Sequence, residues 1–95
     1  MSIPLALIRR FSPQMISARQ IRAARALIGL GQHELASLAG CGVATIRRIE
    51  TVSDEIRGNA QTLDRIQRAL EAAGIIFINQ DGSHGPGVML KSPLP

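Results

Sequence analysis

Aromatic side chains are almost absent from this chain of 95 residues, which has two Phe and no Trp or Tyr. Proteins that bind single-stranded nucleic acid stack its bases on exposed aromatic rings, so the composition argues against this class. Apolar residues make up 45% of the chain and are mostly Ala, Ile and Leu. This composition favours a core built from helices over a large β-sandwich.

Cysteine and histidine are too few to build a cross-linked or metal-bound scaffold. The one cysteine, Cys41, excludes an intramolecular disulfide and gives no sign of an oxidising compartment. Two isolated histidines, His33 and His84, do not complete a structural zinc site with it. We therefore expect neither a metal nor a cofactor, and we expect Cys41 to fill space in the core.

Long apolar runs and catalytic groupings are missing as well. The apolar run within residues 1–8 has about six residues, which is too short for a secretory signal or a membrane span. No Ser/His/Asp, Cys/His or paired-carboxylate pattern stands out, and Gly29-x-Gly31 lacks the rest of a dinucleotide-binding motif. We expect a cytoplasmic protein that makes no membrane contact and is not an enzyme.

Positive charge is what the chain has in excess. Eleven Lys+Arg, ten of them Arg, stand against seven Asp+Glu, which gives a net charge of +4 and a pI near 11.1. Residues 17–50 hold five Arg against two Glu, or +3, whereas residues 51–74 hold three Arg against four acids, or −1. The charge predicts a polyanionic partner for the first of these segments.

The apolar spacing predicts four helices, over residues 17–28, 32–39, 42–50 and 59–73. Ser17 followed by Gln20 is a capping-box pattern, and Gly29, Gly40 and Gly74 are stop signals. Residues 75–79 and 88–91 are strand candidates that predict a hairpin. The chain thus divides into an N-terminal extension (1–16), a helical domain (17–74) and a hairpin with its tail (75–95).

Two of these helices are joined by a tight turn. Ala36 is small where two helices would cross, Gly40 permits a left-handed turn, and Ile46 would pack back between the helices. This spacing describes a helix-turn-helix. The stretch resembles the Cro and phage-repressor (XRE-type) helix-turn-helix family, through residues Gln32, Glu34, Leu35, Ala36, Gly40, Ala44, Thr45, Ile46, Ile49 and Glu50.

The resemblance extends over about residues 17–90 and implies a fold. It begins with Ile21, Arg22 and Arg25 and ends in Leu70-Glu-Ala-Ala-Gly74-Ile-Ile-Phe77 and Gly85-Pro-Gly87-Val. Small bacterial regulators of this type end in a β-hairpin. The resemblance therefore implies a mainly α fold, a four-helix lambda-repressor-like helix-turn-helix domain with a short C-terminal β-hairpin.

The resemblance also implies roles. Residues 42–50 would form the recognition helix in the major groove of double-stranded DNA, with Arg48, Val43 and Ala44 facing base edges. The implied phosphate ligands are Gln32, Thr45, Arg47, Arg57 and Asn59. Arg25 and Glu50 would form an ion pair that holds the first helix to the third. The expected function is that of a nucleoid-associated transcriptional regulator, acting as a repressor.

The hairpin leaves two interpretations open. The run Ile75–Ile78 is apolar on both faces, so one face needs a cover besides the helices. We expect that cover to be a second copy that contacts Ile76, Phe77 and Ile78. The alternative is packing of residues 1–11 over the strand, and the same segment could instead serve as a DNA-binding arm through Arg9 and Arg10.

Two other functions remain open. The chain could be an antitoxin that binds DNA and, through its apolar tail, a toxin protein. It could also be a protein-interaction module that kept the helical fold without binding DNA, since Asp54 and Glu55 would repel phosphates.

Overall fold

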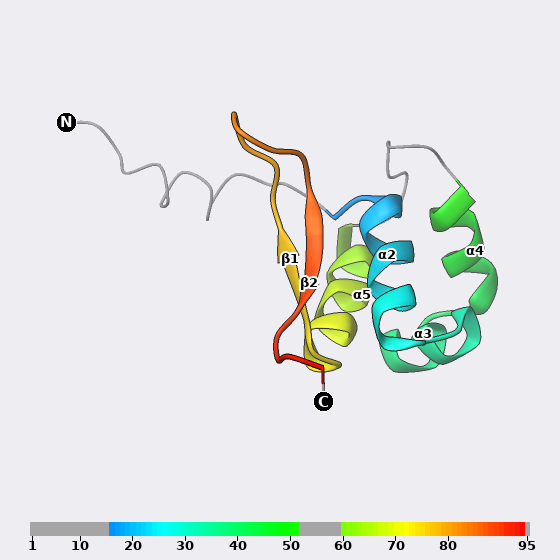
Figure 1. Cartoon of the computed structure of the whole chain (residues 1–95). Helices are drawn as coiled ribbons and strands as arrows, with labels where there is room; N and C mark the ends of the chain where they lie inside the picture. The colour runs from blue at the N-terminus through cyan, green and yellow to red at the C-terminus, as the bar shows by residue number, and fades with distance from the viewer. Residues whose placement is uncertain (1–15, 52–59, 95) are drawn as a thin grey trace.

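A computed structural model describes residues 16–51 and 60–94. The described residues form helices α2 (Ala18–Ile28), α3 (Gln32–Ala39), α4 (Val43–Thr51) and α5 (Ala60–Ala72), followed by strands β1 (Ile75–Ile78) and β2 (Gly87–Leu90). The expectation of a mainly helical fold with a C-terminal hairpin is confirmed. The hairpin stands on one side of α2 and α5, and α4 lies on the opposite side of the molecule (Figure 1).

The start of α2 is held by the predicted capping box. The Ser17 hydroxyl accepts a bond from the Gln20 N–H at 3.1 Å, and the Gln20 side chain accepts one from the Ser17 N–H at 2.8 Å. The helix ends at Gly29, which adopts the left-handed conformation with a φ of 67°. Both ends of α2 are therefore set by local signals in the sequence.

The turn between α3 and α4 uses two glycines in different ways. Gly40 ends α3 with a φ of 70°, and the Cys41 N–H closes the turn on the Ala36 carbonyl at 3.0 Å. Gly42 precedes α4 without a positive φ, and its carbonyl accepts the first bonds of that helix. The helix begins at Val43 and ends at Thr51, one residue later at each end than predicted.

The core lies where α2, α3, α4 and α5 meet under the hairpin. Ile46, predicted to pack back between the helices, is fully buried, and Ala36 belongs to the same buried cluster. One predicted bound is wrong: the last helix was expected to extend to residue 73, but α5 ends at Ala72 and Ala73 is exposed. The buried core cluster consists of Ile16, Ile21, Ala24, Leu35, Ala36, Ala39, Ile46, Ile49, Leu63, Ile66, Leu70 and Ile75.

The hairpin is antiparallel and pairs Ile75 with Leu90, Ile76 with Met89, Phe77 with Val88 and Ile78 with Gly87. The first strand begins at Ile75 as predicted and ends one residue early, at Ile78. The second lies one residue earlier at both ends than predicted. The inner face buries Ile75, and Phe77, Val88 and Leu90 pack against the core. The buried Gln20 amide also donates to the carbonyls of Ile78 (3.1 Å) and Gly87 (3.0 Å). These contacts dock the hairpin on α2.

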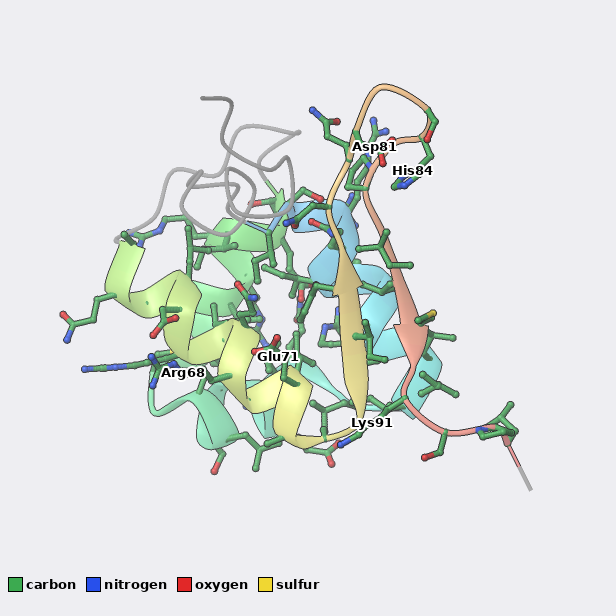
Figure 2. All side chains as sticks on the ribbon, turned by 90° about the vertical axis from the view of Figure 1, so that its left-hand side faces the viewer. Arg68, Glu71, Asp81, His84 and Lys91 are labelled. Atoms are coloured by element: carbon green, nitrogen blue, oxygen red, sulfur yellow. The ribbon has the colours of Figure 1, made fainter. Side chains whose placement is uncertain are left out.

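The loop between the strands is organised by Asp81 (Figure 2). Its Oδ1 accepts bonds from the Ser83 hydroxyl and N–H, both at 2.7 Å, and from the His84 N–H at 3.1 Å. The bonds from Ser83, then the bond from His84, lower the pKa of Asp81 to about 2. The carboxylate is therefore ionised at neutral pH and keeps the loop in this shape.

The two turn glycines give a matched test. No atom lies within 4 Å of a Cβ built on either Gly40 or Gly42, so they differ in backbone conformation and not in space. We expect Gly40→Ser to lower the free energy of unfolding by about 1–2 kcal/mol, because a side chain resists the left-handed region. We expect Gly42→Ser to raise it by a few tenths of a kcal/mol by capping α4. Urea denaturation of both variants measures these changes, and equal effects would contradict the assignment.

Candidate nucleic-acid interface

A buried carboxylate connects the segments around α4. The Glu50 side chain is 4% exposed and accepts two bonds from Arg25, Nε to Oε2 and Nη2 to Oε1, both at 2.7 Å. The same guanidinium donates from Nη1 to the Leu30 carbonyl at 3.1 Å. The ion pair implied by the family resemblance is thus present, in the bidentate geometry that gives a charged pair a single orientation.

Two more side chains converge on Glu50. The Gln32 amide donates to Oε1 at 3.0 Å, and Arg22 donates from Nη1 to the Glu50 carbonyl. We call Arg22, Arg25, Gln32 and Glu50 the polar hub. The hydrogen bond to Glu50 raises the pKa of Arg25 above its ordinary value, against a smaller opposing effect of burial. The Arg25 guanidinium therefore stays charged. The hub joins α2, the start of α3 and the end of α4.

The outward face of α4 carries cations and small side chains. Ala44, Arg47, Arg48 and Thr51 are exposed, and Ala44 lies one turn from Arg47 and Arg48. Arg47 Nη2 lies 3.4 Å from Nε2 of His33, which is exposed at the start of α3. Gly42, which precedes α4, has no side chain, so it cannot cap the first N–H groups of the helix.

The three residues predicted to face bases are not equivalent. Ala44 and Arg48 are exposed, whereas Val43 is half-buried and packs against the core. Among the predicted phosphate ligands, Arg47 is exposed and Thr45 is half-buried. Gln32 is half-buried, with its amide on Glu50. Arg57 and Asn59 lie outside the described residues.

Sequence reasoning missed two members of the polar hub. Arg22 was given no contact of its own and Gln32 was expected to bind a phosphate, yet both donate to Glu50. A signal was present in the spacing, because Arg22 lies three residues before Arg25 and therefore on the same side of α2. Their partner Glu50 lies 28 and 18 residues further along the chain, beyond the reach of a local pattern.

In the part of the chain that the structure describes, we also looked at metal-ligating residues, membrane-spanning helices and the cysteine. No three His, Cys, Asp or Glu side chains gather there as a metal site would require. Within residues 16–51 and 60–94, no helix has the length and apolar character needed to cross a bilayer. The cysteine packs against the core at the α3–α4 turn, where burial raises the pKa of its thiol and Arg65 opposes this more weakly.

Comparison with known proteins does not assign the chain to a family. No protein-family model matches the chain, and no curated protein does. The family resemblance therefore stays a prediction, and the function has to be argued from the exposed face of α4 and the polar hub.

Removing Glu50 tests the polar hub. We expect Glu50→Ala to lower the free energy of unfolding by about 3 kcal/mol, because it leaves the half-buried Arg25 guanidinium without its counter-charge. The matched control is Glu34→Ala, which removes an exposed carboxylate that accepts one bond from the Gly31 N–H. This control should cost less than about 1 kcal/mol. Chemical denaturation measures both, and similar losses would show that the hub contributes no more than a surface contact.

Proposed function

We propose that the protein is a sequence-specific regulator that binds double-stranded DNA with α4 in the major groove. The observation that carries the proposal is the pairing of a buried hub with an exposed basic face on the same helix. Glu50 is neutralised inside the fold by Arg25, so α4 presents Arg47 and Arg48 outward without a neighbouring free acid on the helix. Such a face meets the negative potential of a DNA groove.

The residues have separate roles in this proposal. Arg48 donates two bonds to the major-groove edge of guanine, and Ala44 leaves room for a thymine methyl group. Arg47 neutralises a phosphate, and the first N–H groups of α4 and the Thr45 hydroxyl face the backbone. The half-buried Val43 contributes apolar contact through its exposed part only. Arg57 and Asn59 remain proposed phosphate ligands from the sequence.

The proposed outcome of binding is repression. A domain that occupies an operator excludes other proteins from that stretch of DNA. The proposal includes a cytoplasmic, nucleoid-associated location and a homodimer, because a two-fold protein matches a palindromic operator.

An antitoxin is a second candidate, and one observation favours it. Ile76 and Met89 form a cross-strand pair on the outer face of the hairpin, and they are 36% and 48% exposed. An exposed apolar pair can receive another protein. Co-purification of a small protein encoded beside this one would support this function. A mobility-shift assay with the native upstream region at about 0.15 M salt separates both candidates from a module that binds no DNA.

The first prediction of the proposal concerns specificity. We expect Arg48→Ala to lose about 1–3 kcal/mol of operator binding and to relax selectivity at one base pair. Arg68→Ala is the matched control. Arg68 is exposed on α5, so this substitution removes the same charge at a site away from α4. Binding-site selection from random duplexes followed by titration of each variant gives both quantities. Unchanged selectivity in the Arg48 variant would contradict its role in reading bases.

The second prediction concerns the phosphate contact. We expect Arg47→Ala to weaken binding to all sequences alike and to reduce the slope of log Kd against log salt by about one. Its physical reason is the loss of one released counterion per neutralised phosphate. Titrations at several salt concentrations measure the slope, and a sequence-dependent loss with the slope intact would instead make Arg47 a base-reading residue.

A further inference from the structure

The first two residues of α3 both reach across to α4. Gln32 donates to the buried Glu50 at 3.0 Å. The next residue, His33, contacts Arg47, with Nε2 of the ring 3.4 Å from Nη2 of the guanidinium. Because Arg47 and Glu50 are three residues apart, the start of α3 holds α4 at two points about one turn from each other. The inner point belongs to the polar hub, whereas the outer point is exposed beside the basic face.

The chemistry of the two side chains fixes the direction of the outer contact. A guanidinium has N–H donors and no acceptor, so Nε2 of His33 must accept from Arg47. A neutral imidazole carries one proton, which in this contact therefore lies on Nδ1. In this tautomer the ring offers Arg47 a lone pair and does not repel it.

Acidic side chains that could draw Arg47 elsewhere are missing from its own helix. The residues four positions before and after it on α4 are Val43 and Thr51, and neither is an acid. Glu34, the acid next to His33, accepts a bond from a backbone N–H at the start of α3. Within residues 16–51 and 60–94, His33 is therefore the side chain that orients the Arg47 guanidinium.

We propose that His33 is a positioning residue for Arg47 at the DNA interface. The ring takes one N–H of the guanidinium and holds the group beside the start of α3, and the remaining N–H groups are left to meet a phosphate. Arg48 has no such partner in the described part of the chain and keeps the freedom to reach a base edge. This role rests on the proposed function, because it concerns how α4 contacts DNA.

The length of the contact sets the size of the expected effect. Ordering a long side chain on binding costs free energy, and a side chain that is ordered beforehand avoids part of that cost. A contact of 3.4 Å between two exposed side chains restricts Arg47 without immobilising it. We therefore expect loss of the His33 ring to weaken operator binding about three- to fivefold.

A double-mutant cycle in the full chain tests this role. Operator affinity is titrated for His33→Ala, Arg47→Ala and the double variant, at about pH 8, where imidazole rings are neutral. We expect His33→Ala to weaken binding about three- to fivefold when Arg47 is present and to have no effect when it is absent. The slope of log Kd against log salt should not change in His33→Ala, because a neutral ring releases no counterion. His33→Gln should bind like the wild type, because its amide oxygen can accept the same bond.

The outcomes separate this role from the alternatives. An equal loss from His33→Ala with and without Arg47 overturns it and makes His33 an independent contact. A glutamine variant as weak as the alanine variant overturns it as well, as does a salt slope reduced by about one. Ser37→Ala, exposed on the same helix, is the matched control and should leave the affinity unchanged. Unchanged circular dichroism shows that each variant is folded.

The same titrations distinguish this role from the proposed function. If the wild-type chain binds no duplex, the proposed function fails and the role of His33 fails with it. If the wild type binds and the losses from His33→Ala and Arg47→Ala simply add, the role of His33 alone is overturned.

Discussion

The bidentate contact of Arg25 with Glu50 is the interaction on which the rest of the structure depends. A carboxylate 4% exposed is costly to bury alone, and the cost is offset because Arg25 and Gln32 between them donate to both of its oxygens. These donors come from α2 and the start of α3, while Glu50 lies near the end of α4. The contact therefore sets the angle of α4 against the helices behind it, which an apolar core of Ile and Ala alone would define less sharply.

The same contact determines what α4 shows to the outside. Since Glu50 points inward and is neutralised there, Arg47 and Arg48 dominate the exposed side of the helix. Were Glu50 exposed, its negative charge would weaken the positive potential of this face, and the proposed approach to a phosphate backbone would be less favourable. The nine-residue helix α4 thus keeps the charge that holds the fold, Glu50, on its inner side. The charges proposed to meet DNA, Arg47 and Arg48, lie on its outer side.

Local signals in the sequence predicted much of this fold. The capping box of Ser17 and Gln20, the left-handed Gly40 and the buried Ile46 all depend on spacings of a few residues, and each is present. The second role of Gln20 was not predicted, because its amide reaches carbonyls 58 and 67 residues away, where no local pattern extends. The end of the last helix was also predicted wrongly, at residue 73. The apolar periodicity of the sequence continues past Ala72, where α5 ends. At the candidate interface, Arg48 and Ala44 were placed correctly on the exposed face, whereas the half-buried Val43 depends on how α4 packs.

Helix α2 connects the two ends of the molecule through side chains five residues apart. Gln20 holds the hairpin, and Arg25 holds α4. Five residues correspond to about 7.5 Å along the helix axis, a rigid spacing of less than two turns. A small core has too few packing contacts to fix the orientation of two surfaces by itself. Directional hydrogen bonds from one helix fix both orientations with only a few residues.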